Sequence, residues 1–193
     1  MATAKKVSSK KKVSGKSTAP KAVKKIGKKA VAKADVSISL LKPGQKAPAF
    51  SLSDESGKKV SLSSLKGKKL VLYFYPKDHT PGCTQESCDF RDSFARIKRA
   101  GALVFGVSRD SVTSHEKFKA KLELPFSLLS DEEGKMCEAY DVWKEKSMYG
   151  RKYMGIVRTT VIVDENGKII QVFPKVSIKG HADEVLNILE AHA

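Results

Sequence analysis

The 193-residue sequence has few cysteines and no long apolar run. Three cysteines do not form an even disulfide framework, so we expect free or reactive thiols in a reducing compartment. No apolar run approaches the roughly 18–20 residues that a membrane helix needs, and the amino terminus lacks the apolar core of a signal peptide. We therefore expect a cytoplasmic protein that makes no membrane contact.

Residues 1–37 lack aromatic residues and arginine but are rich in lysine. Residues 1–35 hold twelve Lys and one acidic residue, Asp35, and so carry +11 of the net charge of +16. The absence of Arg disfavours a mitochondrial presequence. We expect a disordered basic tail over residues 1–37, followed by a folded domain over residues 38–193. The tail could contact nucleic acid non-specifically, direct nuclear import, bind an acidic partner, or only add solubility.

Short apolar stretches separated by turn residues predict a mixture of strands and helices. Residues 70–75 are apolar, β-branched and aromatic and are stopped by Pro76, which is typical of a buried strand. We expect further strands at 49–52, 59–62, 102–107, 125–129, 156–163 and 168–173, and helices at 81–99, 111–122, 133–141 and 181–191. This order matches an α/β, thioredoxin-like sandwich with a central mixed β-sheet flanked by helices.

Cys83 follows the strand at 70–75, where the next helix is expected to begin. Thr80 is a good N-cap, Pro81 suits the first helical position, and Gly82 lets the backbone turn closely. Cys83 would then lie among unpaired N–H groups at the positive end of the helix, which favours the thiolate. A cysteine can also be simply a small buried apolar residue. Its position after a strand, and a second cysteine five residues later, favour a reactive thiol.

Cys88 lies on the same expected helix as Cys83. Five residues advance a helix by about 500° and 7.5 Å, which places the two Cα atoms roughly 8–9 Å apart. A disulfide needs Cα atoms within about 7 Å, so a redox pair here would require the first turns to unwind in each cycle. This spacing argues against a CxxC thiol oxidoreductase. It favours a sulfenic acid on Cys83 that Cys88 condenses.

Arg158 interrupts the apolar strand expected at 156–163. A thiolate that attacks a peroxide needs donors that stabilise charge along the breaking O–O bond. A buried guanidinium needs an anionic partner, so Arg158 is the candidate donor; the alternative is an edge-strand arginine that points to solvent. Thr80 could orient the peroxide through its hydroxyl, or it could serve only as the N-cap.

The spacing of Pro76, Thr80 and Cys83 resembles the Pro-x-x-x-Thr/Ser-x-x-Cys signature of peroxiredoxins. The likeness covers about residues 40–192 and is greatest to the bacterioferritin-comigratory-protein, or PrxQ, branch. The similar segments are residues 75–92, 143–146, 148–151 and 155–158.

This resemblance implies a thioredoxin-dependent thiol peroxidase that reduces hydrogen peroxide and organic hydroperoxides. It implies that Cys83 is the peroxidatic cysteine and that Cys88 is the resolving one, which forms an intramolecular disulfide with it. It places Pro76, Thr80 and Arg158 around the peroxide. It also implies no metal, no organic cofactor and often a monomer.

Cys137 stands where the resembled pattern has a small apolar residue. We expect a buried core thiol there, while resolution by Cys137 instead of Cys88 is the alternative. The spacing does not suggest a zinc site formed by the three cysteines and His79. His79 and Asp78 are expected to be loop residues, and His115 is expected to pack on the inner side of its helix.

The basic tail also lies outside the resembled pattern. It supports a rival interpretation, a redox-sensitive nucleic-acid-associated protein, for which a nuclear location would replace the cytoplasmic one. The domain itself lacks the interleaved basic and aromatic residues of sequence-specific readout.

Overall fold

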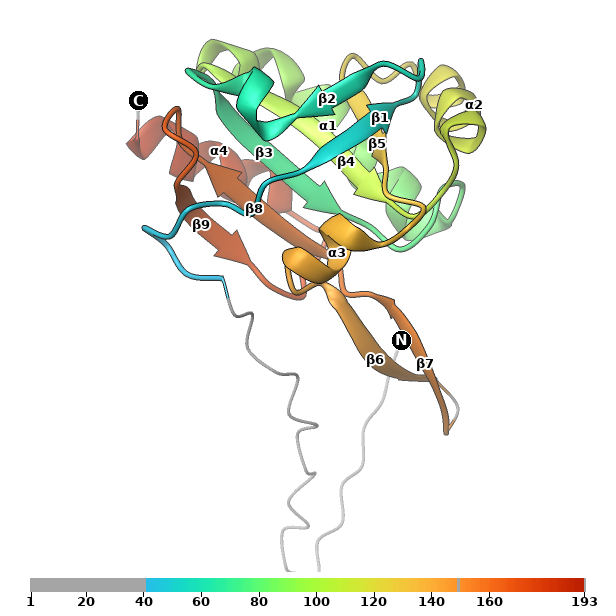
Figure 1. Cartoon of the computed structure of the whole chain (residues 1–193). Helices are drawn as coiled ribbons and strands as arrows, with labels where there is room; N and C mark the ends of the chain where they lie inside the picture. The colour runs from blue at the N-terminus through green and yellow to red at the C-terminus, as the bar shows by residue number, and fades with distance from the viewer. Residues whose placement is uncertain (1–40, 149, 193) are drawn as a thin grey trace, which may run out of the picture. The chain divides into compact units, whose positions relative to one another are not determined.

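The computed structural model describes residues 41–148 and 150–192, with only the backbone at Met148 (Figure 1). The expected tail, residues 1–37, and its boundary with the domain lie outside the described residues. The strands are β1 (Ser51–Asp54), β2 (Lys59–Ser61), β3 (Lys69–Phe74), β4 (Ala102–Ser108), β5 (Ser127–Ser130), β6 (Trp143–Met148), β7 (Arg151–Ile156), β8 (Thr159–Val163) and β9 (Ile169–Phe173). The helices are α1 (Pro81–Arg99), α2 (Val112–Leu122), α3 (Lys135–Ala139) and α4 (His181–Ala191), with a 3-10 turn, η1 (Leu62–Leu65). Within the described part, no helix is both long and apolar enough to cross a membrane.

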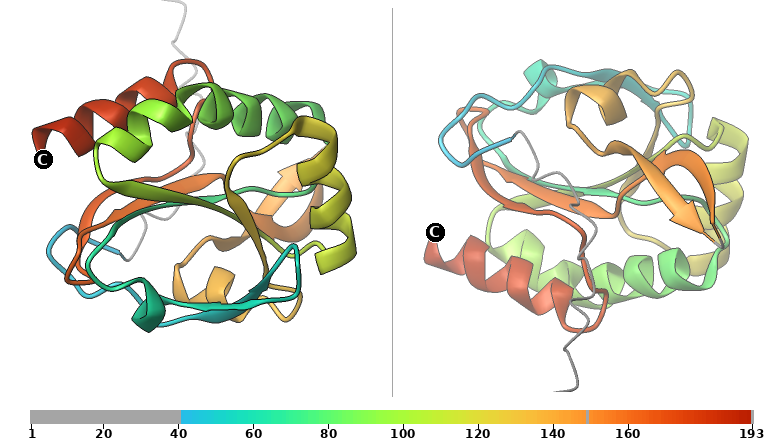
Figure 2. Two further views of the ribbon diagram at one scale, coloured as in Figure 1. Left: turned by 90° about the horizontal axis from the view of Figure 1, so that it is seen from above. Right: turned by 90° about the horizontal axis from the view of Figure 1, so that it is seen from below.

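Seven strands form one mixed sheet in the order β2-β1-β5-β4-β3-β8-β9. β3 and β4 run parallel, as do β4 and β5, while β8 pairs antiparallel with both β3 and β9. α1 and α4 lie side by side over one face and α3 lies over the other (Figure 2). The expected mixed sheet flanked by helices is confirmed.

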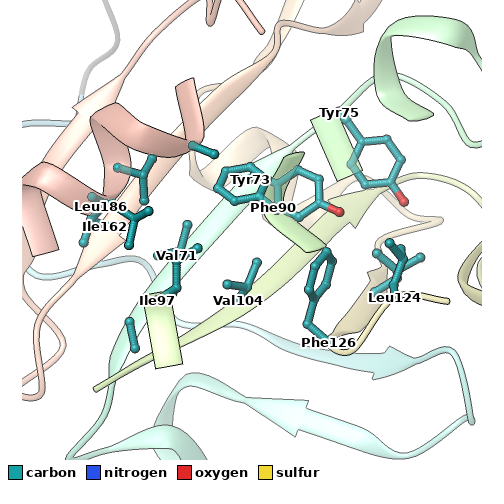
Figure 3. Packing of buried hydrophobic residues seen from close by; sticks show 14 of the residues in the cluster. Val71, Tyr73, Tyr75, Phe90, Ile97, Val104, Leu124, Phe126, Ile162 and Leu186 are labelled. Carbon is teal, nitrogen blue, oxygen red and sulfur yellow. The ribbon is translucent and has the colours of Figure 1, made fainter. Parts of the chain in front are cut away.

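β3 is an interior strand between β4 and β8, and its side chains alternate between the two faces as strand geometry requires. Val71 and Tyr73, with Tyr75 just beyond the strand, contribute to the cluster beneath α1 and α4, in which the ring centroids of Tyr73 and Phe90 are 4.8 Å apart (Figure 3). Leu70, Leu72 and Phe74 face the other cluster, which includes Met136 and Cys137 of α3. All six residues of β3 are buried because both faces of the sheet are covered, which explains the continuous apolar run.

The strand expected at 156–163 is two strands separated by a link. β7 ends at Ile156 and pairs with β6 in a separate hairpin, whereas β8 begins at Thr159 and pairs with β3 and β9. Val157 and Arg158 lie in the link, where Val157 N–H donates to Val142 O at 2.8 Å. An apolar run does not reveal that the chain changes partner, so the single-strand prediction was wrong.

The β6–β7 hairpin itself was not predicted, because residues 143–148 are rich in Lys and Glu and give no apolar strand signal. The expected hairpin near residues 49–62 is present as antiparallel β1 and β2.

Candidate active site

α1 begins at Pro81 with Thr80 at the N-cap position, as predicted. The Thr80 side chain makes no capping bond, because its hydroxyl donates to Lys77 O at 2.9 Å in the preceding loop. The position was therefore predicted correctly, but the capping hydrogen bond was not. Cys83 follows in the first turn, where backbone N–H groups lack helical partners, and it is only 1% exposed.

Arg158 reaches the Cys83 sulfur from the β7–β8 link. Its Nη2 donates to Cys83 Sγ at 3.3 Å, and its Nη1 pairs with Glu86 Oε2. Glu86 lies three residues after Cys83 on α1, so one helical turn presents the sulfur and the carboxylate to the same guanidinium. The Arg158 side chain is 16% exposed, which contradicts the alternative of a solvent-pointing arginine.

The Glu86 carboxyl is buried beside this contact, and its Oε1 has no hydrogen-bond partner among the described residues. Burial raises the pKa of Glu86 to about 7, although the charge of Arg158 opposes this shift. Burial also disfavours the Arg158 cation, but Glu86 and Cys83 hold the pKa of Arg158 above its ordinary value. The site therefore contains one permanent cation and two groups that can be anionic.

Gly82 contributes space instead of the tight turn that we expected. It lies inside α1 and does not have a positive φ. A Cβ atom at Gly82 would lie 3.4 Å from Arg158 Nη2 and 3.3 Å from Ile178 Cδ1. The missing side chain therefore lets the guanidinium approach the start of α1.

The loop between β3 and α1 is held by the Asp78 carboxylate. Asp78 Oδ1 accepts from the Tyr75 hydroxyl at 2.7 Å, and Oδ2 accepts from the Ser114 hydroxyl at 2.7 Å and lies 2.9 Å from His115 Nδ1. Burial opposes the charge, yet the bonds from His115 and Ser114 keep the pKa of Asp78 below its ordinary value. Asp78 was expected to be a loop carboxylate, and His115 was expected to be packed inward. Both expectations are confirmed, and the bond between them anchors the loop to α2.

Pro76 is exposed and lines a surface cavity of about 360 Å³. The cavity extends from the loop across the β6–β7 hairpin. The other lining residues are Arg109, Glu132, Trp143, Lys146, Tyr153, Met154, Gly155 and Ile156. Tyr153 and Met154 are exposed apolar side chains, at 44% and 50%.

Cys88 lies on the continuous helix α1, and none of the three cysteines is disulfide-bonded. Cys88 is half-buried and packs against the same apolar cluster as Cys83. The end of α2 lies against this side of α1, where Arg91 Nη1 donates to Leu122 O at 3.0 Å.

Cys137 is fully buried, as expected. It belongs to the cluster on the opposite face of the sheet from Cys83, and burial raises the pKa of its thiol. Within the described residues, no group of three His, Cys, Asp or Glu side chains has the geometry to hold a metal ion.

The sequence analysis missed Glu86 and Lys146 as members of the site. The signal for Glu86 was present, because a carboxylate three residues after Cys83 falls on the apolar face of the helix. Lys146 gave no signal, since it is one of several lysines in a segment without a strand pattern.

The AhpC/TSA family model matches residues 43–172. The putative peroxiredoxin bcp of Coxiella burnetii is 53% identical over 146 residues, which cover 76% of this chain and 97% of that protein. Peroxiredoxin Bcp of Bacillus subtilis is 52% identical over 147 residues, which cover 76% of this chain and 94% of that protein.

Solved structures from Xanthomonas campestris are also similar. Peroxiredoxin Q of that organism shares 44% identity with a TM-score of 0.73, covering 80% of this chain and 98% of that one. A structure of its bacterioferritin comigratory protein, described for alkyl peroxide reduction activity, shares 43% identity with a TM-score of 0.72, covering 80% and 99%. The matches agree with the resemblance that the sequence motifs indicated.

Proposed function

Because the chain belongs to the AhpC/TSA family and is a peroxiredoxin, a thiol peroxidase, we propose that Cys83 is the sulfur that attacks the peroxide. The observation that carries this proposal is the 3.3 Å contact between Arg158 Nη2 and Cys83 Sγ. A cation that donates to the sulfur stabilises the thiolate, which is the nucleophilic form. The first-turn position of Cys83 acts in the same direction.

The first step converts the Cys83 thiolate to a sulfenic acid. The sulfur forms a bond to the terminal peroxide oxygen, the O–O bond breaks, and water or an alcohol leaves after protonation. Arg158 can donate to both the sulfur and the peroxide, because a guanidinium carries five N–H donors in a fixed plane. Glu86 holds that plane in position through its contact with Nη1.

Thr80 and Pro76 are proposed to border the peroxide. The Thr80 hydroxyl donates its proton to Lys77 O, so the lone pairs of its oxygen can accept a hydrogen bond from the peroxide O–H. Pro76 lies at the cavity beside the loop and leaves no N–H group there to compete for the substrate.

Cys88 is proposed to resolve the sulfenic acid as an intramolecular disulfide. The continuous α1 helix keeps the two sulfurs apart, because five residues separate the Cα atoms by roughly 8–9 Å. The first turns of α1 must therefore unwind for Cys88 to reach Cys83. A dithiol reductant of the thioredoxin type would then restore both thiols by exchange.

We propose hydrogen peroxide and small organic hydroperoxides as substrates, and a cytoplasmic, monomeric enzyme. A test is peroxide consumption in a thioredoxin system by the full chain and by Cys83→Ser. Loss of turnover in the variant supports the assignment, with Cys137→Ser as the matched cysteine control. Full activity of Cys83→Ser would refute it.

The basic tail, residues 1–37, is proposed to make non-specific contacts with nucleic acid. The support is its concentration of charge, since residues 1–35 carry +11. Such contacts should weaken steeply with salt and be indifferent to base sequence. The test compares DNA retention by the full chain and by residues 36–193 across salt concentrations. Equal retention would eliminate this role.

A further inference from the structure

Lys146 differs from the other lysines of the β6–β7 hairpin in lacking a carboxylate partner. Lys144 pairs with Asp141, and Lys152 Nζ lies 3.0 Å from Glu145 Oε1. In the described part of the chain, Lys146 has no carboxylate within ion-pair distance, and its Nζ instead donates to the Ile156 carbonyl at 2.9 Å. A partly buried ammonium without an anionic partner is costly. This site therefore suits an anion that forms during the reaction.

Gly155 lies beside the Lys146 side chain and influences its direction. The two residues lie on neighbouring strands of the hairpin, and a Cβ atom at Gly155 would lie 3.1 Å from Lys146 Cδ. That distance is tighter than most Cβ contacts, so a side chain at residue 155 would push the lysine stem aside by a few tenths of an ångström. The stem is thereby directed along β7 toward the link that carries Arg158.

Lys146 lies at the cavity and close to the link that carries Arg158. It lines the same cavity as Pro76, and its ammonium is held by a carbonyl two residues before Arg158. Burial and the charge of Arg158 hold the pKa of Lys146 below its ordinary value, while the Cys83 sulfur opposes this shift.

The oxidation of Cys83 needs a group that can release a proton. When the O–O bond breaks, the departing oxygen carries a negative charge and must be protonated. Arg158 cannot supply this proton because a guanidinium is not deprotonated in proteins. Glu86 is 1% exposed and its carboxylate pairs with the guanidinium, and the His115 nitrogens face Asp78 and Leu129. Lys146 combines a titratable cation with a position on the cavity.

We propose that Lys146 donates the proton to the departing oxygen in the oxidation of Cys83. The S–O bond forms as the O–O bond breaks, so the sulfur is oxidised by two electrons and the peroxide is reduced. The proton moves from Lys146 Nζ to the departing oxygen and gives water or an alcohol. The neutral amine regains its proton from solvent. This inference rests on the proposed role of Cys83.

The test compares two oxidants that differ in their need for a proton. Hydrogen peroxide releases hydroxide, whereas peracetic acid releases acetate, which is a stable anion. The rate of Cys83 oxidation is measured by rapid quench and mass spectrometry in the full chain and in Lys146→Met. We expect Lys146→Met to slow the reaction with hydrogen peroxide by roughly 100-fold and to leave the reaction with peracetic acid nearly unchanged.

Two further variants separate proton donation from charge or structure. Lys146→Arg keeps the cation but cannot release the proton, so it should be slow with hydrogen peroxide and normal with peracetic acid. Lys152→Met, which removes an exposed lysine of the same hairpin, should match the unmodified chain with both oxidants.

Equal slowing of both oxidants in Lys146→Met, recovery in Lys146→Arg, or no effect of either change would overturn the proposal. These results would leave the role of Cys83 intact, since that role fails only if Cys83→Ser retains activity.

Discussion

Asp78 and His115 are joined by a buried 2.9 Å contact between Oδ2 and Nδ1, although 37 residues separate them in the chain. Asp78 lies in the loop that leads to Cys83, and His115 lies at the end of the first turn of α2. The Asp78 backbone N–H also donates to Asp110 Oδ2 at 2.8 Å, just ahead of α2. The loop before the reactive cysteine is therefore fixed to the neighbouring helix by buried polar groups.

Asp78→Asn should lower the free energy of unfolding by roughly 1–3 kcal/mol. The amide places N–H donors where the carboxylate accepts from Tyr75, Ser114 and His115, so at least one buried group loses its partner. Urea denaturation near neutral pH measures the change. Asp183→Asn, at the exposed pair with Arg96, is the control and should change stability by less than about 1 kcal/mol. Equal effects of the two substitutions would contradict this account of the loop.

The raised pKa of Glu86 predicts that part of the free energy of unfolding depends on pH. Its pKa is raised from 4.5 to about 7 in the folded chain, chiefly by burial, so the folded state binds more protons than the unfolded state between these values. This contribution to stability is present in full below about pH 4.5 and is lost as the pH rises through about 7, by up to about 3 kcal/mol.

Glu86→Gln cannot titrate and should lack this component. The difference in unfolding free energy between the two chains, measured by denaturation from about pH 5 to about pH 8, should therefore slope with pH. Asp92→Asn, on the exposed side of the same helix, should give a flat difference. A flat difference for Glu86→Gln as well would show that the carboxyl does not titrate in this range.

Arg158→Met should slow the oxidation of Cys83 by roughly 100- to 1000-fold, the usual effect of removing a preorganised donor. Arg158→Lys should recover little, because an ammonium cannot contact Cys83 and Glu86 with two coplanar arms. Single-turnover peroxide consumption measures the rate. Arg151→Met, at an exposed arginine of β7, is the control, and an equal loss there would point to a general effect of charge.

Cys88→Ser should consume one equivalent of peroxide rapidly and then stall, because no thiol condenses the sulfenic acid. Cys137→Ser should recycle normally, since Cys137 lies on the other face of the sheet. A non-reducing peptide map after one equivalent of peroxide should contain a Cys83–Cys88 link, and amides 84–88 should lose protection from hydrogen exchange. Normal steady-state turnover by Cys88→Ser would remove Cys88 from the mechanism.

The sequence predicts most of this fold because the central elements have strong local signals. β3 is a continuous apolar run ended by Pro76, and α1 begins with Thr80 and Pro81, so both were placed within one residue. The β6–β7 hairpin was missed, since its side chains are mostly polar and its pairing depends on the partner strand. The division of residues 156–163 was missed for the related reason that β7 and β8 join different sheets.

The site was predictable where one segment carries it and less so where distant segments meet. Cys83 and Thr80 follow from the strand–loop–helix pattern, and Arg158 follows from a charge within an apolar run. The position of Lys146 depends on the close approach allowed by Gly155 on the neighbouring strand. Local sequence does not encode such an approach.

Trp143 is the only tryptophan in the chain, and it lines the cavity beside Pro76. Its ring lies beneath the Arg109 guanidinium, with 4.5 Å between Arg109 Cζ and the ring centroid. Indole emission depends on nearby charge and on contact with water. Any molecule that fills the cavity or displaces Arg109 should therefore alter the fluorescence of a single known residue, so the native chain contains its own optical reporter of occupancy.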